Sequence, residues 1–589
     1  MLHVKVRRRG RIAASLVASL GLVGAAGAVT TGPAQSVPPT GDCPTAFAVA
    51  DLVEGQLVEG LTVTKGTTPT EFTGSVIGVL EDGIAPDVDM IMMELDSDEI
   101  RRVGGIWQGM SGSPVYTTTG ELIGAVAYGL SWGPSPVAGI TPYAEMKRYL
   151  PAGPAGSSPA RKVDVGSADA SRIAAGSDVT QSQAAGGFSR LPMPKSFVGV
   201  RGSLLDRAAT QAPPNGRFRP YVAKHASTGT MGASAAAADA STLVAGGNLG
   251  ASFAYGDITA GGVGTVTSVC EGRLVGFGHP MMFSGKSSLS MHPANALYVQ
   301  EESLGAPFKM ANIAAPAGTI TDDRTSGISG DLGVLPPTMD VTSNLTYLGV
   351  PRSGTTHVSV PEANAEMTFY QQLVNHDAVL DSYGGGSELQ RWTITGTDNG
   401  TPFTIRHRDR FTSDYDIAFE SPWDVADAVW AVSAMPGVVV DTVEVNGDLT
   451  DDTSTWRVTR LEQNRGGRWF NVNRRHPAWA KAGGTLRIRA LLESGDESDT
   501  VSLAISVPNR VQKTSGVIFV GGGGSSWSNM GRADSVAKLK TALSTMARND
   551  AVEAQLLLEG RRGMFEGRDV SGPADKVVLG HRLASVVVR

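Results

Sequence analysis

The chain has 589 residues, too many for a single hydrophobic core, and this length predicts about three or four domains. Charged residues make up 18% of the chain and hydrophobic residues 41%, which excludes a disordered protein and favours a globular one. The 73 glycines and 32 prolines indicate many turns and a chain inclined to β-structure. A formal net charge of −7 argues against binding to nucleic acid or to anionic lipid.

The N-terminal segment has the order of features typical of a secretory signal. Basic residues within 5–11 precede an apolar run over 12–29, and this run contains the small-residue stretch Ala26-Gly-Ala28. We therefore expect residues 1–28 to form a signal peptide, and the mature protein to be secreted or retained in the cell envelope. An uncleaved membrane anchor is the alternative. No later segment is apolar enough to span a bilayer.

Cys43 and Cys270 are the two cysteines of the chain. In an exported protein they can form a disulfide, but their separation in sequence leaves the pairing open. Two thiols without histidines at a matching spacing do not make a zinc site, so no metal is expected.

Residues 43–150 predict short β-strands separated by turns. The expected strands are rich in β-branched and aliphatic residues and lie at 61–64, 72–80, 90–95 and 122–127. Residues 142–150 predict a short helix that closes this region. The stretch that follows, Pro151–Gly187, is rich in Ala, Gly and Ser without sustained periodicity, so we expect a linker over residues 151–195.

A candidate nucleophile lies within this β-rich region. The stretch Gly109-Met-Ser111-Gly-Ser-Pro has the form Gly-x-Ser-Gly-x-Pro, in which chymotrypsin-like peptidases present their serine. Glycines permit positive φ values, so the amides of Gly109 and Ser111 can point into one pocket and stabilise an oxyanion. An ordinary turn is the alternative, because Gly, Ser and Pro dominate turns generally. The catalytic interpretation requires a base for Ser111.

The candidate base comes later in the chain. Residues 264–279 alternate as a β-hairpin around Glu271-Gly272 and end with His279 between a glycine and a proline. A lone histidine is more often a structural group than a base, but a residue that serves packing rarely has so little side chain on both sides of it. Asp323 lies in a turn-rich run after it and either orients the imidazole or caps a turn.

The residues from Asp96 to Pro114, together with Leu274-Val-Gly-Phe-Gly-His279-Pro, resemble the SpoIVB-type serine peptidase family. The resemblance implies a chymotrypsin-like double β-barrel in which Ser111 is the nucleophile and His279 the general base. It places Asp96, fifteen residues before the serine, where the family has its proposed acid. Asp323 is the alternative acid.

The order of the two segments departs from the family pattern. In the sporulation enzyme the histidine segment precedes the serine segment, whereas here the serine segment comes first. The order of triad residues differs among unrelated folds, so the two halves can still face each other.

Five regions follow the signal peptide. They are a serine-bearing barrel half (43–150), the linker (151–195), a histidine-bearing barrel half (196–348), β-sandwich-like accessory domains (349–515) and a C-terminal α+β segment (516–589). A helix is expected over Trp423–Met435. The glycine run at 521–524 lacks the lysine and hydroxyl of a phosphate-binding loop, so we expect an ordinary loop there.

These features predict a secreted serine endopeptidase that acts through an acyl-enzyme and needs no metal or organic cofactor. Its expected substrates are proteins or peptides, including its own linker. A non-catalytic envelope or extracellular binding protein on a peptidase-like scaffold is the competing hypothesis, because a fold alone does not guarantee activity.

Overall fold

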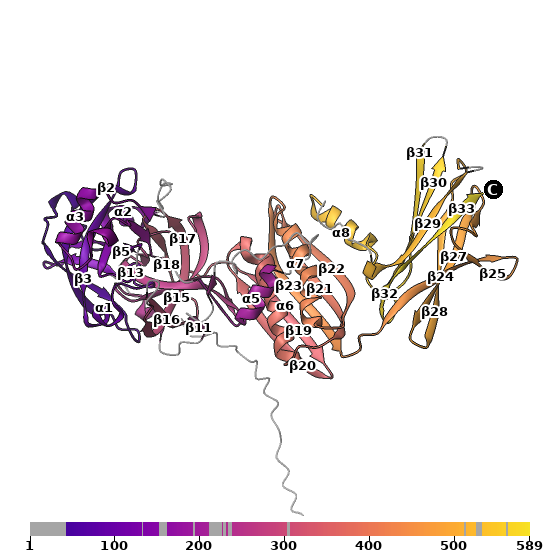
Figure 1. Ribbon diagram of the computed structural model, residues 1–589, viewed down its shortest axis with the longest axis horizontal. Coiled ribbons are helices and arrows are strands. Elements are labelled where there is room, and N and C mark those ends of the chain that lie inside the picture. The colour runs from indigo at the N-terminus through magenta and orange to yellow at the C-terminus, as the bar shows by residue number, and fades with distance from the viewer. Residues whose placement is uncertain are drawn as a thin grey trace, which may run out of the picture. The chain divides into compact units, whose positions relative to one another are not determined.

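A computed structural model describes most of the chain after the expected signal peptide (Figure 1). It describes residues 43–589 except 132, 152–161, 192–194, 211–225, 228–230, 234–237, 303–306, 512–513, 526–532 and 561–562. Strands account for 52% of the structure and helices for 18%, which confirms the mostly β fold class. None of the described helices combines the length and the apolarity that a membrane crossing requires. The expected signal peptide lies outside the described residues.

The first barrel carries the candidate nucleophile. Its six strands pair in the order β4-β1-β2-β3-β6-β5, and a further pairing of β4 with β5 closes the ring. The strands are β1 (Leu57–Thr62), β2 (Thr70–Ala85), β3 (Val88–Asp96), β4 (Pro114–Thr117), β5 (Leu122–Leu130) and β6 (Val137–Pro142). Phe72, Ile91 and Trp107 are among the side chains buried in its core, so alternate strand residues fill the interior. A short helix α1 (Asp98–Val103) precedes the serine loop.

The helix expected at 142–150 is present as α2 (Tyr143–Met146) followed by a 3-10 turn (Lys147–Tyr149). The linker expected over 151–195 is wrong for most of its length. Residues from 162 onward form β7 (Lys162–Val163), α3 (Ser167–Ala175), α4 (Gln181–Ala184) and β8 (Phe188–Arg190). Ile173, Ala184 and Phe188 are buried against the first barrel, and β8 pairs with β5. The small residues of this segment therefore pack rather than leave it unstructured; residues 152–161 lie outside the described residues.

The second barrel carries His279. Its strands pair in the order β13-β14-β18-β17-β15-β12, and pairing of β13 with β12 closes it. They are β12 (Asn248–Gly256), β13 (Thr259–Cys270), β14 (Arg273–Gly276), β15 (Gly285–Gln300), β17 (Gly318–Arg324) and β18 (Gly327–Leu332). The predicted hairpin is β13–β14, and its turn residues Glu271 and Gly272 have φ values of 49° and 80°. The chymotrypsin-like arrangement of two closed six-stranded barrels is confirmed.

Several smaller elements flank the second barrel. They are β9 (Lys195–Val198), α5 (Gly202–Thr210), β10 (Ala226–Ser227), β11 (Met231–Ala233) and β16 (Phe308–Ile313). β16 pairs with β15 and reaches the serine loop through a bridge between Gln108 and Phe308. Cys43 and Cys270 form a disulfide across 227 residues, which ties the segment ahead of the first barrel to the end of β13.

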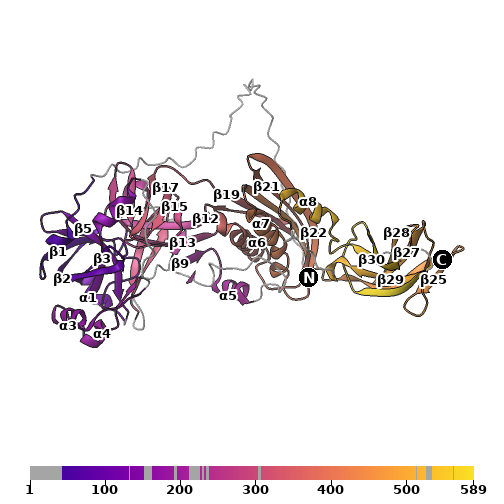
Figure 2. The same ribbon diagram turned by 90° about the horizontal axis from the view of Figure 1, so that it is seen from above.

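A helix-covered sheet follows the barrels. It contains β19 (Met339–Tyr347), β20 (Val350–Val358), β21 (Gly386–Asp398), β22 (Thr401–Ser413) and β23 (Val438–Thr450), and β20 also pairs with β12 of the second barrel. Two helices, α6 (Asn364–Leu380) and α7 (Pro422–Ser433), pack against it (Figure 2). The helix predicted at Trp423–Met435 is α7. This layer of sheet and helices replaces the sandwich expected directly after residue 349.

The C-terminal region is a β-sandwich. One sheet has the order β25-β24-β27-β28 with β32 beside β24, and the other has the order β26-β33-β29-β30-β31. Their strands are β24 (Thr455–Arg465), β25 (Arg468–Val472), β26 (Ala478–Ala480), β27 (Thr485–Ser494), β28 (Glu497–Ser506), β29 (Ser515–Gly522), β30 (Val552–Gly560), β31 (Gly563–Val570), β32 (Val577–Leu579) and β33 (His581–Val588). Both sheets share one apolar core, so the expected domain boundary at 515/516 is wrong. The apolar side of α8 (Val536–Thr545) instead joins the core of the helix-covered sheet.

The glycine run at 521–524 serves packing. A Cβ at Gly522 would lie 2.0 Å from the carbonyl oxygen of Val578, and one at Gly523 would lie 1.7 Å from that of Arg548. These glycines therefore allow neighbouring backbone to approach, and no phosphate-binding role is needed to explain them.

Candidate active site

Glycine geometry shapes the loop that carries Ser111. Gly109 and Gly112 both have φ values of 95°, a backbone conformation that residues other than glycine rarely adopt. A Cβ at Gly112 would lie 2.0 Å from the carbonyl oxygen of Thr265 in β13. The glycines in the sequence motif therefore let the loop of the first barrel lie directly against a strand of the second.

Strands of the second barrel hold this loop by hydrogen bonds. The Thr265 amide donates to the Ser111 carbonyl at 2.8 Å, and its hydroxyl donates to the Gly109 carbonyl at 3.1 Å. The hydroxyl of Thr267 donates to the Gly112 carbonyl at 2.7 Å. On the other side, the amide of Lys309 in β16 donates to the Gln108 carbonyl at 2.9 Å. The position of Ser111 is thus set by both barrels.

His279 lies on the loop between β14 and β15, and the first barrel holds it in turn. The hydroxyl of Thr141 in β6 donates to the Gly278 carbonyl at 2.6 Å. Phe277 and Gly278 have φ values of 69° and 68°. A positive φ at a phenylalanine is uncommon and carries strain, which is often found at functional sites. Each barrel therefore stabilises the loop of the other.

The structure brings the two candidate residues into contact. The Nε2 atom of His279 lies 2.9 Å from the Ser111 hydroxyl oxygen, within the range expected of a nucleophile and its base. The Nδ1 atom lies 2.9 Å from the carbonyl oxygen of Pro280. Because a carbonyl oxygen only accepts, Nδ1 carries the proton and Nε2 is left free to accept from Ser111.

Burial keeps the imidazole neutral. Ser111 is 3% exposed and His279 is 1% exposed. Loss of solvent lowers the pKa of His279 to about 3, with a smaller contribution from the positive charge of Arg190, against the hydrogen bond to Pro280. A neutral imidazole has the lone pair that a general base requires, so the ring is in its proton-accepting form across a wide pH range.

The backbone amides around Ser111 divide into two groups. The amides of Met110, Gly112 and Ser113 donate to carbonyls at 3.0, 2.8 and 3.0 Å. In contrast, the amides of Gly109 and Ser111 have no hydrogen-bond partner among the described residues. Unpaired amides beside a serine hydroxyl are the donors that an oxyanion needs. These are the two amides that the sequence motif singles out.

The hydroxyl of the other motif serine, Ser113, takes part in a different hydrogen bond. The Ser113 hydroxyl donates to the Thr62 hydroxyl at 2.9 Å, and Ser113 is fully buried. Of the two motif serines, only Ser111 contacts the imidazole.

The structure does not bring Asp96 to the imidazole, which corrects the placement expected from its spacing. Asp96 is the last residue of β3, its side chain is 55% exposed, and its carboxylate pairs with Arg101 of α1. Both nitrogens of the buried His279 ring already have other partners. Asp96 therefore forms a solvent-exposed ion pair with Arg101 and does not orient the imidazole.

Asp323 lies close to the histidine loop but does not contact the ring. Its two carboxylate oxygens accept from the amides of Met281 and Met282, each at 2.7 Å. The Ser284 amide donates to it at 3.3 Å. Burial raises the pKa of Asp323, and these backbone hydrogen bonds oppose the shift. Asp323 thus holds the turn that begins with Pro280, the residue whose carbonyl orients His279.

Sequence reasoning missed Thr141, Thr265, Thr267 and the Pro280 carbonyl. The threonines lie in ordinary strands with the β-branched residues that strands favour, so nothing distinguishes them before the barrels are packed. A backbone carbonyl leaves no trace in the sequence at all. The proline after His279 was the one available signal, since it restricts the turn that presents this carbonyl.

Residues 18–143 match the family model described as SpoIVB peptidase S55. No curated protein and no solved structure gave a significant match to the chain. The matched range contains Ser111 and Asp96 and ends before His279, so it does not test the reversed order of the two segments. The match confirms the resemblance to SpoIVB-type peptidases.

Proposed function

We propose that this SpoIVB-type chain is a secreted serine endopeptidase, with Ser111 as nucleophile and His279 as general base. The observation that carries the proposal is the 2.9 Å contact between the Ser111 hydroxyl and His279 Nε2. The two unpaired amides beside Ser111 support it, because a serine, a base and an oxyanion site then lie within one loop cluster.

The geometry supports an acyl-enzyme mechanism. His279 Nε2 takes the proton of Ser111 as the hydroxyl oxygen attacks the peptide carbonyl, and the amides of Gly109 and Ser111 stabilise the resulting oxyanion. The imidazolium then protonates the leaving amine. In the second half, His279 takes a proton from the water that attacks the ester, and the imidazolium then gives this proton to the Ser111 oxygen as it leaves the acyl group.

The Pro280 carbonyl takes the place that a carboxylate has in a triad. It accepts the Nδ1 proton at 2.9 Å, which selects the productive tautomer and stabilises the imidazolium by its dipole. Asp323 acts one step further away as a positioning residue, because its carboxylate holds the amides that follow Pro280. Neither Asp96 nor a metal or organic cofactor has a part in this scheme.

The disulfide supports an extracytoplasmic location. Cys43 and Cys270 are paired, and disulfides persist mainly in oxidising compartments. Together with the signal-like N-terminus, this favours secretion or retention in the cell envelope. Self-cleavage within 162–190 is disfavoured, because that segment is folded and a peptidase needs an extended substrate.

A fluorophosphonate probe tests the proposal directly. We expect the purified chain to react at Ser111, because only a serine activated by a base attacks the probe. The site of labelling is read by peptide mass spectrometry, with Ser111→Ala as the negative variant and Ser113→Ala as the matched control that retains the label. Labelling of Ser113, or a folded chain that takes up no label, would show that Ser111 is not an activated nucleophile and would contradict the proposed peptidase site.

The roles of the two aspartates can be separated by one pair of variants. Asp323→Asn keeps one acceptor oxygen and turns an NH₂ group toward a backbone N–H, so we expect the labelling rate to fall about 10–100-fold through misplacement of His279. Asp96→Asn should change the rate less than about twofold, because its solvated ion pair lies away from the ring.

The two rates are measured below the thermal transition of each variant, so that unfolding does not contribute. Asp323→Glu, which keeps both acceptor oxygens, should recover part of the rate. A large loss in Asp96→Asn with an unchanged Asp323→Asn would restore Asp96 as the acid and refute the arrangement described here.

A further inference from the structure

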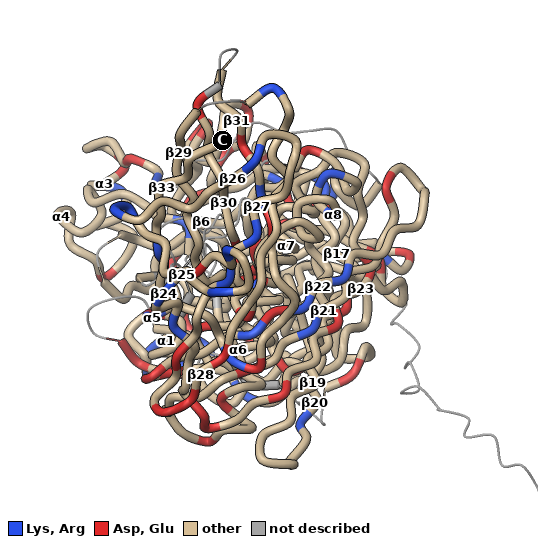
Figure 3. Tube along the Cα trace, turned by 90° about the vertical axis from the view of Figure 1, so that its right-hand side faces the viewer, with Lys and Arg blue, Asp and Glu red and all other residues tan. Residues whose placement is uncertain are grey.

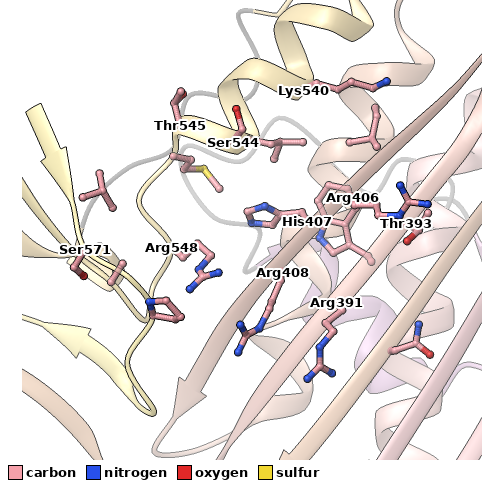
Figure 4. Close-up of a pocket in the computed structure, with 18 of the residues that line it drawn as sticks. Arg391, Thr393, Arg406, His407, Arg408, Lys540, Ser544, Thr545, Arg548 and Ser571 are labelled. Carbon is pink, nitrogen blue, oxygen red and sulfur yellow. The ribbon is translucent and has the colours of Figure 1, made fainter.

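A cavity of about 890 Å³ lies where β21, β22 and α8 meet the loop before β30 and the end of β31 (Figure 4). Its lining carries six cationic side chains: Arg391, Arg406, Arg408, Lys540, Arg548 and Arg568. No aspartate or glutamate lines it. In a chain with a net charge of −7, this is a local excess of positive charge, and Figure 3 marks basic positions along β21 and β22.

Three of the six cations are neutralised from outside the cavity. Arg391 pairs with Asp448 at 2.8 Å, Arg548 pairs with Asp550 at 2.9 Å, and Arg568 pairs with Glu553. The other three, Arg406, Arg408 and Lys540, have no carboxylate partner among the described residues. The cavity therefore keeps a net positive charge that the protein itself does not balance.

The sheet places like charges next to one another. Arg391 of β21 lies directly opposite Arg408 of β22 in the strand register. Opposed like charges destabilise a pair of strands. Arg406 precedes Arg408 by two residues and so projects from the same face of β22. An anion bound between these guanidinium groups would remove the repulsion.

One polar atom on this face of the sheet lacks a partner inside the protein. The Nε atom of Arg408 is buried and has no hydrogen-bond partner among the described residues. Buried polar atoms are normally satisfied, so each one requires an explanation. A ligand that accepts from Arg408 supplies the missing acceptor.

We propose that this cavity binds a small polyanion that carries phosphate groups. Planar guanidinium groups bind phosphate oxygens in pairs, and five of the six cations are arginines. Ser544, Thr545 and Ser571 add hydroxyl donors to the same lining. The volume is that of a small-molecule site. The proposal is independent of the peptidase mechanism, since the lining contains neither Ser111 nor His279.

The polar face of α8 contributes to the cavity while its apolar face is used for packing. Lys540 and Ser544 line the cavity, whereas Leu539 packs into the core of the helix-covered sheet. The negative end of the helix is covered, because Arg568 donates to the Thr545 carbonyl. The arrangement keeps the helix terminus from repelling an anion.

Isothermal titration calorimetry of the whole mature chain with tripolyphosphate tests the proposal. We expect saturable binding that weakens as the salt concentration rises, and at least about 10-fold weaker binding in the double variant Arg406→Ser/Arg408→Ser. Arg487→Ser, an exposed arginine of β27 outside the cavity, is the matched control and should bind as the wild type does. Because the double variant loses a like-charge contact, its thermal midpoint should not fall.

Citrate, titrated in parallel, separates phosphate from carboxylate recognition. Weaker binding of citrate than of tripolyphosphate supports the phosphate class, and tighter binding of citrate overturns it. Absence of tripolyphosphate binding, or equal binding by the wild type and the double variant, would overturn the site itself. Lys540→Ala provides a second variant if the double variant does not fold.

Discussion

Replacing Ser111 or His279 with alanine should lower the turnover of a peptide substrate by about 10⁴–10⁶-fold. Either change removes the whole nucleophile and base pair, because the two groups act through the one 2.9 Å contact. The double variant should lose no more than either single variant, since residues that act as a unit are not additive. Turnover is measured with a quenched fluorescent peptide library. Additive losses would show that the two residues act separately.

The pH dependence of the wild type provides a second readout of the same pair. A general base must be neutral, and burial lowers the pKa of His279 to about 3. The rate constant for fluorophosphonate labelling should therefore stay level between about pH 8 and pH 5. A fall centred near pH 6.5, the ordinary value for histidine, would contradict the environment described for His279.

The stability of the folded chain, unlike the labelling rate, should decrease as the pH falls. The folded pKa of His279 lies below the unfolded value, so the unfolded chain binds the proton first as the pH falls. The contribution of His279 to stability is present above about pH 6.5 and is lost progressively toward pH 3. Circular dichroism at each pH separates unfolding from loss of the base.

The parts of the site that could be predicted from the sequence are those carried by local motifs. Ser111 and His279 stand among glycines that a close approach of backbone requires, and these glycines are visible in the sequence. The orienting group could not be predicted, because a main-chain carbonyl at Pro280 has no side-chain signature. Asp96 matched a spacing, but its position at the exposed end of β3 is decided by the register of the barrel.

The fold shows the same division between local and non-local information. Alternating strands and α7 follow from periodicity, so they were predicted. The helix α6 was not, because its buried side chains include Gln371, Gln372 and Asn375, which hide the apolar stripe of an ordinary helix. The sandwich boundary was misplaced because β29–β33 complete a core that β24–β28 begin, and pairing between distant strands leaves no local signal.

Reducing the Cys43–Cys270 disulfide, or replacing both cysteines with serine, should destabilise the barrel region by about 5 kcal/mol in the chain-entropy model. The effect is large because the disulfide closes a loop across 227 residues, and a long loop costs the unfolded chain more entropy when it is closed. The end of β13 would lose its covalent tie to the segment ahead of the first barrel.

The measurement must report on the barrels, because the sandwich has an apolar core of its own and a single transition for the whole chain is not expected. Labelling of Ser111 by a fluorophosphonate in increasing urea meets this need, since it requires both barrels to be in place. We expect the midpoint to fall by about 1 M or more on reduction of the wild type. The double serine variant should start at this lower midpoint and show no response to reductant. An unchanged midpoint in the reduced wild type would mean that the contacts between the barrels, led by those of Thr265 and Thr141, hold the site without the disulfide.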